Sequence, residues 1–183
     1  MERHFDYDIM TEIKERWSAR ALAPGRIDRE EVFALLEAAR YAPSCFNEQP
    51  WRFVLADEEG SLDRMRGILT ESNQRWANKA PVLILIVSKK TFNHNGKDNY
   101  WHMFDAGTAW GYLSLEAWRR GLVAHPMAGF KREEARDIFN IPQEYDIITV
   151  IAVGKHGLKE DLEPDLQERE HPDTRKEIRE LLL

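Results

Sequence analysis

Two uninterrupted runs of β-branched residues and leucine constrain the fold of this chain more than any other feature. Residues 82–87 (VLILIV) and 147–153 (IITVIAV) lack the regular polar alternation of a strand with one face in water. Continuous apolar runs of this length are typical of strands that are covered on both faces. We therefore predict a central sheet with helices packed against each side.

Helical start and stop signals surround these runs. Asp28, with Glu31 three residues later, resembles a capping box at the start of one helix. Asp105 can cap another helix, and Gly121 can end it. The expected helices span about residues 1–20, 28–42, 60–69, 105–120 and 131–140, and a further strand spans residues 51–56.

The length and composition are those of one globular domain. The chain has 183 residues, of which 43% are apolar and 32% charged, without repeats, low-complexity segments or long linkers. We therefore expect a single domain over residues 1–183. The polar stretch after Gly154 ends in three leucines, 181–183. This pattern is typical of an arm that lies along a surface or is exchanged between subunits, and a frayed tail is the alternative.

Charge and cysteine content exclude several classes of function. A formal net charge of -6 makes non-specific nucleic-acid binding a poor expectation, although a local basic cluster could hold one small anion. The single cysteine, Cys45, excludes a disulfide framework, and the six histidines lack metal-binding spacing. The first ten residues are too charged for a signal peptide, and no apolar run approaches ~18 residues. We expect a cytoplasmic protein with no metal and no membrane segment.

A short arginine segment is the first candidate for ligand chemistry. Arg16, Ser18 and Arg20 place two guanidiniums and a hydroxyl within five residues. Guanidiniums offer planar, paired donors that suit phosphate. Both could reach one anion whether the N-terminal helix continues through this segment or ends at it. The alternative is a solvated helix end with ion pairs to Glu12 or Glu15.

A proline-bracketed loop is the second candidate. In residues 42–51 (APSCFNEQPW), two prolines stiffen the backbone, and Ser44, Asn47 and Gln49 supply hydrogen-bonding side chains. A stiff loop of this kind can present polar groups to the edge of a planar ligand. The alternative is a connecting loop whose Ser and Asn side chains cap its own backbone.

In their order along the chain, these segments and several others resemble the nitroreductase family of FMN-dependent oxidoreductases. The resemblance covers almost the whole chain. It is carried by RWSAR at 16–20, APSCFNEQPW at 42–51, NQRW at 73–76, DAG at 105–107, HPMAGF at 125–130, VG at 153–154 and RK at 175–176.

The resemblance implies an α+β fold, a three-layer α/β/α sandwich with a central, mostly antiparallel sheet and a C-terminal arm exchanged in a homodimer. It implies FMN at the subunit interface, NAD(P)H as the reductant, and a small electron-poor acceptor such as a nitroaromatic or a quinone. Hydride transfer would follow a ping-pong order. Because the cofactor carries this chemistry, no side chain is assigned as a catalytic acid or base.

The resemblance also implies which residues contact FMN. The family segments at the phosphate and the pyrimidine side of the ring match Arg16, Trp17, Ser18 and Arg20, with Arg175 also at the phosphate. The residues expected to reach the flavin from the other subunit are Pro43, Ser44, Cys45 and Asn47. Those expected beside the flavin ring are Asn73, Met127, Ala128 and Gly129.

Three positions depart from patterns found in parts of the family. Trp76 stands where some members have a lysine, and Ala128 where certain members have an acidic residue. Residues 173–175 (DTR) stand where some members have a Lys-x-Arg pair. These differences place the chain in a branch other than the well-known oxygen-insensitive nitroreductases.

Alternative functions remain open at this point. The same scaffold could bind or store flavin without turnover, or it could carry out FMN-dependent reductive dehalogenation. Cys45 could be a nucleophile if His125 lies beside it as a base. The aromatic cluster at 100–104 (YWHMF) could belong to the core or a dimer interface, or Trp101 could line the substrate side of the flavin.

Overall fold

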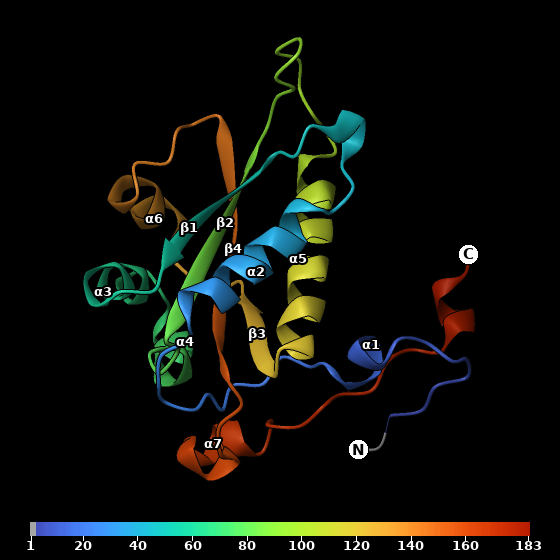
Figure 1. Cartoon of the computed structure of the whole chain (residues 1–183), viewed down its shortest axis with the longest axis vertical. Coiled ribbons are helices and arrows are strands. Elements are labelled where there is room, and N and C mark those ends of the chain that lie inside the picture. Colours follow the sequence, from blue (N-terminus) through green and yellow to red (C-terminus); the bar gives the residue numbers. More distant parts are fainter. Residues whose placement is uncertain (1–2) are drawn as a thin grey trace.

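Four strands form an antiparallel sheet at the centre of the molecule (Figure 1). The computed structural model describes residues 3–183. The strand order is β1-β2-β4-β3, and each neighbouring pair is antiparallel. The strands are β1 (Trp51–Ala56), β2 (Val82–Lys89), β3 (Leu122–Met127) and β4 (Tyr145–Lys155).

Both faces of the sheet are covered by helices. Along residues 82–87 of β2, the even-numbered side chains enter a core with α2 (Arg29–Arg40) and α5 (His102–Arg119). The odd-numbered side chains enter a second core on the opposite face. That core is closed by α3 (Glu59–Gly67), α4 (Glu71–Ala77) and α6 (Arg132–Ile138). This arrangement confirms the predicted three-layer α/β/α sandwich.

The N-terminal helix is much shorter than predicted. Helix α1 spans only Thr11–Glu15, and Arg16 already has extended backbone angles, with φ -61° and ψ 139°. Ile9 and Ile13 are exposed, and α1 contains no buried residue. Because short helices are stabilised mainly by packing of an apolar face, a segment that buries none of its residues stays helical for little more than one turn.

The start signals in the sequence predicted α2 and α5, but neither predicted capping residue acts as a side-chain cap. Helix α2 begins directly after Asp28, but the Asp28 side chain makes no capping hydrogen bond. Helix α5 begins at His102, so Asp105 lies in its first turn and is not the cap. Gly121 ends α5 as expected, with φ 71° and its amide bonded to the carbonyl of Trp118.

Two elements were not predicted from the sequence. Helix α4 is mostly polar, and only Trp76 and Ala77 are buried at its end. Strand β3 contains Pro126, which cannot donate a ladder hydrogen bond. Because β3 lies at the edge of the sheet, that proline is tolerated. The remaining short elements are α7 (Pro164–Gln167) and the 3₁₀ turns Cys45–Asn47, Lys159–Asp161 and Ile178–Leu181.

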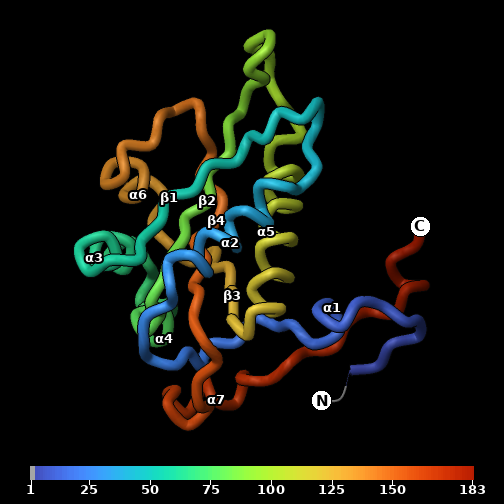
Figure 2. The backbone as a smooth tube through the Cα atoms, viewed as in Figure 1, coloured from blue at the N-terminus to red at the C-terminus, as the bar shows by residue number. Residues whose placement is uncertain are grey.

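The two chain ends run side by side away from the sheet (Figures 1 and 2). Close to the sheet, Leu22 pairs with His156 in an antiparallel bridge, and the amide of Gly157 donates to the carbonyl of Ala21 at 2.8 Å. The C-terminal arm therefore lies against the N-terminal segment of the same chain. Its apolar end, residues 181–183, is exposed.

Candidate functional site

A cationic cavity of about 500 Å³ lies between the two chain ends. Five residues that were expected near one phosphate line it together: Arg16, Trp17, Ser18, Arg20 and Arg175. The lining residues that motif reasoning missed are Arg3, His125, Arg169, His171 and Asp173. Apart from His125, these missed residues come from the two terminal arms, where the family motif is limited to residues near Arg175.

The extended backbone explains how the arginine segment faces the cavity. Alternate residues of an extended chain project to the same side, and Arg16, Ser18 and Arg20, which follow the end of α1 without helix, all line the cavity. A guanidinium nitrogen of Arg16 lies 3.4 Å from the hydroxyl of Ser18. Ala19, on the opposite side, is fully buried. The two arginines thus converge on one cavity by an extended geometry and not by sharing a helical face.

The guanidiniums of this cavity crowd one another. Burial, followed by the charges of Arg3 and Arg175, lowers the pKa of Arg16 from its usual value. Burial and Arg169 likewise lower the pKa of Arg20. None of the arginines that line the cavity forms an ion pair with a carboxylate within residues 3–183. A cluster of like charges of this kind favours an anionic ligand.

His125 joins the cavity to the core beneath it. Its Nδ1 donates to the carbonyl of Ala19 at 3.0 Å, and its ring packs on Trp76 with centroids 4.5 Å apart. Trp76 is itself buried, so the residue that replaces a family lysine is part of the core. Burial, partly opposed by the hydrogen bond to Ala19, lowers the pKa of His125 to about 4.

Asn73 and Gly129, both expected beside the flavin ring, are in direct contact. The Asn73 amide nitrogen donates to the Gly129 carbonyl at 2.9 Å, and the Thr70 hydroxyl donates to the same oxygen at 3.0 Å. A Cβ on Gly129 would lie 2.7 Å from Asn73 Nδ2 and 2.8 Å from Thr70 Oγ1, so a larger residue would displace the two side chains that hold this carbonyl. Asn73 is one helical turn before Trp76, whose ring packs on His125 of the cationic cavity.

The other two residues of this segment differ in exposure. The side chain of Met127 is buried in the core, and its carbonyl accepts a hydrogen bond from the Thr149 hydroxyl at 2.9 Å. Ala128 is exposed. Any contact of Met127 with a ligand would therefore use its backbone.

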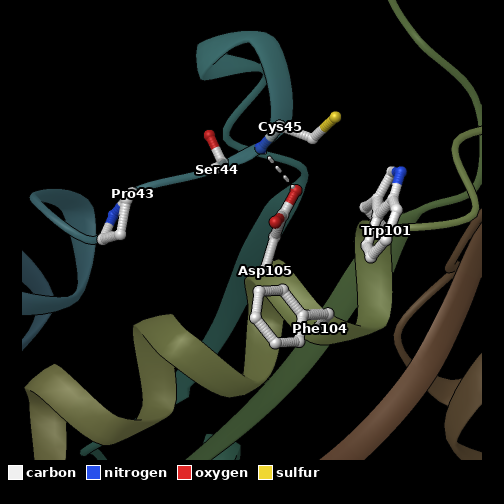
Figure 3. A pocket seen from close by; sticks show the side chains of 6 residues that line it. All are labelled: Pro43, Ser44, Cys45, Trp101, Phe104 and Asp105. Carbon is white, nitrogen blue, oxygen red and sulfur yellow. Dashed lines mark hydrogen bonds between the residues drawn. The ribbon is translucent and has the colours of Figure 1, made fainter.

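A second cavity, of about 190 Å³, is lined by the proline-bracketed loop and by the start of α5 (Figure 3). The lining residues are Pro43, Ser44, Cys45, Trp101, Phe104 and Asp105. The Asp105 carboxylate accepts a hydrogen bond from the Cys45 amide at 3.1 Å, and burial raises the pKa of this carboxyl. Figure 3 shows the Cys45 thiol pointing away from Asp105. Trp101 is 56% exposed, so it is not a core residue.

The loop at residues 43–49 has an unusual backbone. Phe46, Asn47 and Gln49 all have positive φ, near 50°, which L-residues rarely adopt. The hydroxyl of Ser44 accepts a hydrogen bond from the Gln49 amide at 3.0 Å. Ser44 therefore does cap its own loop, whereas Asn47 is exposed at the turn.

The two cavities lie at opposite ends of α5. The loop cavity contacts the start of α5 through Asp105. The cationic cavity lies beyond the far end of α5. Leu122, which begins β3 just after α5, pairs with Lys155, and the next residue, His156, pairs with Leu22 at the end of the arginine segment. An 18-residue helix is about 27 Å long at the standard rise. Within one chain, the loop and the arginine segment are therefore not brought together.

Other sites are not supported by the described residues. Across residues 3–183, no group of three or more His, Cys, Asp and Glu side chains is arranged to hold a metal ion. Cys45 and His125 line different cavities, so the structure does not form a Cys–His pair from them. No helix within the described range is long and apolar enough to cross a membrane.

Comparisons with known proteins identify relatives of this chain. A crystal structure described as an oxidoreductase containing FMN is 34% identical, covers 99% of this chain and 93% of its own, and superposes with a TM-score of 0.95. The iodotyrosine deiodinase of Thermotoga neapolitana is 25% identical in an alignment 171 positions long that covers 81% of this chain and 87% of the deiodinase. The major NAD(P)H-flavin oxidoreductase of Aliivibrio fischeri is 24% identical in an alignment 96 positions long that covers 50% of this chain and 44% of that protein.

The sequence model of the nitroreductase family matches residues 13–74 and 58–155. Together these ranges include the arginine segment, the proline-bracketed loop, α5 and all four strands of the sheet. The chain belongs to the nitroreductase family.

Proposed function

We propose that the protein is an FMN-dependent oxidoreductase that uses NAD(P)H to reduce small electron-poor acceptors. One observation carries the proposal: Arg16, Ser18, Arg20 and Arg175 converge on one cationic cavity in a chain of the nitroreductase family. The related crystal structure contains FMN, and the related protein of Aliivibrio fischeri is named for NAD(P)H and flavin.

The residues present fit the phosphate end of FMN. Guanidiniums offer paired donors to phosphate oxygens, and their crowding without an ion-paired carboxylate favours a dianion. A volume of about 500 Å³ lies in the usual range for small-molecule sites. Arg16, Ser18, Arg20 and Arg175 would hold the phosphate, and Trp17 would line the cavity beside it.

The ring of the cofactor would lie along the wall that leads from His125 to Asn73 and Gly129. There the backbone of residues 127–129 would offer polar groups to the ring edge, and Asn73 keeps that backbone in place through the Gly129 carbonyl. When bound, FMN supplies reversible hydride transfer, taking electrons from NAD(P)H and passing them to an acceptor in a ping-pong order. The protein supplies binding, orientation and charge.

We place two copies of the chain in the working enzyme. The loop with Pro43, Ser44, Cys45 and Asn47 lies at the start of α5 and the arginine segment beyond its far end, and the helix between them is about 27 Å long. A two-fold dimer that pairs α5 with its copy in antiparallel orientation would bring the loop of one subunit to the cationic cavity of the other. We propose a homodimer with FMN at this interface, each copy being a single domain over residues 1–183. Residues 169–175 of the C-terminal arm would stay on their own chain, and the exchanged part of the arm would be its exposed apolar end, residues 181–183. Because NAD(P)H is an intracellular reductant, we place the enzyme in the cytoplasm.

Reductive dehalogenation of an aromatic substrate is a second candidate. The observation in its favour is the similarity to the iodotyrosine deiodinase of Thermotoga neapolitana over 87% of that protein. Both functions would use the same cofactor and the same dimer. They differ in the acceptor that takes the electrons.

The visible spectrum of the purified protein, followed by turnover assays, tests these functions. We expect flavin absorbance near ~450 nm and release of FMN on denaturation. We also expect oxidation of NADH or NADPH that depends on an added nitroaromatic or quinone. Release of iodide from an iodinated phenol, without nitroaromatic reduction, would favour the dehalogenase. Tightly bound flavin with no turnover on any reductant would identify a storage protein, and a colourless chain that cannot be reconstituted with FMN would refute the proposal.

A further inference from the structure

We propose that Glu170 and Arg3 are positioning residues that assemble the cationic cavity from the two ends of the chain. The inference rests on the proposed function, because it takes the cavity to hold the phosphate of FMN. Neither residue lies in a segment that carries the family resemblance. Both make hydrogen bonds to the backbone of the arginine segment or of the residues that adjoin it.

The arginine segment depends on outside partners. Arg16 has extended backbone angles, and residues 17–21 belong to no helix or strand until Leu22 meets His156. An extended segment has no internal hydrogen-bond ladder, so its buried amides and carbonyls must be satisfied by other parts of the molecule. Whatever satisfies them also sets the direction in which Arg16 and Arg20 point.

Glu170 satisfies the amides at the end of this segment. Glu170 is only 6% exposed, and its carboxylate accepts hydrogen bonds from the amide of Arg20, at 2.9 and 3.1 Å, and from the amide of Ala21, at 2.8 Å. A buried carboxylate is stable only when its charge is met by donors, and these two amides are the donors that the structure provides. The contact joins residues 150 positions apart.

Arg3 satisfies carbonyls at the beginning of the segment. Its Nη1 donates to the carbonyl oxygens of Lys14, at 2.8 Å, and Arg16, at 3.0 Å. Its Nε donates to the carbonyl of Asp173 at 3.3 Å. One guanidinium thus joins the end of α1, the first arginine of the segment and the C-terminal arm.

These two contacts are complementary. A carboxylate from the C-terminal arm holds amides of the N-terminal segment, and a guanidinium from the N-terminal end holds a carbonyl of the arm. The arm residues that line the cavity are Arg169, His171, Asp173 and Arg175, and they flank or follow Glu170 directly. Glu170 and Arg3 therefore set the spacing between the two sets of guanidiniums. Loss of either contact should weaken recognition of the phosphate more than recognition of the flavin ring.

Comparison of FMN with riboflavin tests the inference, because riboflavin lacks the phosphate. Dissociation constants would be measured by flavin fluorescence for the full chain after removal of flavin. We expect Glu170→Ala and Arg3→Met to raise the Kd for FMN by roughly 10-fold or more and to leave the Kd for riboflavin nearly unchanged. Glu170→Gln keeps one acceptor oxygen and should recover part of the FMN affinity. The matched controls are Glu168→Ala and Arg179→Met, which change exposed residues of the same arm.

The possible outcomes separate the inference from the proposed function. Riboflavin affinity and circular dichroism show whether each variant is folded. If Glu170→Ala does not fold, the FMN affinities of Glu170→Gln and Arg3→Met test the positioning role. Variants that bind FMN as tightly as the wild type, or that lose FMN and riboflavin equally, would overturn the positioning role and leave the proposed function intact. A wild-type chain that binds neither flavin would overturn the proposed function and this inference with it.

Discussion

The imidazole of His125 is held between a cationic cavity and an aromatic core. Because a carbonyl can only accept a hydrogen bond, the contact with Ala19 requires the proton of the neutral ring to lie on Nδ1. The Trp76 ring covers the imidazole, and Arg20 and Arg16 add positive charge nearby. Burial and these charges all favour the neutral form, and burial has the largest effect.

The stability of the protein should therefore depend on His125 at mildly acidic pH. The pKa of His125 is about 4 in the folded chain, against an ordinary value of 6.5 for histidine. Between these values the unfolded chain binds the extra proton, so the free energy of unfolding should fall as the pH decreases from 6.5 toward 4, by up to about 3 kcal/mol. Urea unfolding at pH 7 and pH 5 measures this effect. In His125→Gln the difference between the two pH values should be smaller, and an unchanged difference would contradict the assignment.

Trp101 is the aromatic residue best placed to meet an acceptor. It lines the small cavity with Cys45, whereas its neighbour Tyr100 is 87% exposed and lines neither cavity. In the proposed dimer the cavity beside Trp101 would face the cofactor of the other subunit. A ring at this position can stack on a planar acceptor without touching the phosphate.

Trp101→Ala should raise the KM for a nitroaromatic acceptor by roughly 3- to 10-fold, since one aromatic contact would be lost. FMN affinity should stay at the wild-type value. Steady-state kinetics and flavin titration of the same preparation measure the two quantities, with Tyr100→Ala as the control. If both variants keep the wild-type KM, Trp101 does not line the acceptor site.

At the scale of elements, the end of β4 supports the arginine segment. Lys155 pairs with Leu122 of β3 and also accepts a hydrogen bond from the Ala23 amide at 2.9 Å. Two residues later, Gly157 lies so close to the N-terminal segment that a Cβ would be 2.7 Å from the carbonyl carbon of Leu22. The sheet thereby fixes the position of the chain just after Arg20.

Gly157→Ala should disturb this pairing, because the clash is with backbone that cannot rotate away. We expect a loss of about 1–3 kcal/mol in the free energy of unfolding, as for other overpacked sites. We also expect weaker FMN binding, because the segment that carries Arg20 must move. Chemical denaturation and flavin titration test both effects. The control is Gly67→Ala, where a Cβ would meet no atom within 4 Å, and wild-type stability for Gly157→Ala would refute the prediction.

At the scale of the whole molecule, the outer layer of α2 and α5 is conspicuously apolar. Figure 1 shows no further element of the chain over these two helices. Their exposed large apolar side chains are Phe33, Met103, Phe104 and Tyr112, with Tyr41 directly after α2. Apolar patches on this scale usually mark a contact with another protein, which supports the proposed pairing of α5 with its copy.

The dimer should be visible in solution. Light scattering after size exclusion should give a mass of twice the 21.5 kDa chain. Tyr112→Arg places a charge on the exposed face of α5 and should shift the mass toward that of a monomer and reduce bound FMN. Ile138→Arg, an exposed position on α6, is the control and should leave the dimer intact. A wild-type monomer that binds FMN fully would refute the two-chain site.

Much of the layered fold could be predicted because its signals are local. The runs at 82–87 and 147–153 place apolar side chains on both faces of a strand, and only a strand that is covered on both faces requires this pattern. The predicted helix over residues 1–20 was wrong because the spacing of apolar residues cannot reveal that Ile9 and Ile13 stay exposed. Strand β3 was missed because Pro126 and His125 are poor strand signals, and its position at the sheet edge is a tertiary property.

The sequence by itself determined three of the four strands, the helical layers on both faces of the sheet and the residue types that meet an anion, because periodicity and short motifs depend on neighbours along the chain. Only the tertiary structure decided that Arg3, Arg169 and His171 share the cavity of Arg16 and Arg20. It also decided that Glu170 holds the arginine segment and that the loop around Cys45 lies at the far end of α5. The physical reason is that hydrogen bonds between residues 150 or more positions apart leave no pattern in the sequence, and a site divided between two ends of a helix is defined only when the helix is folded in place.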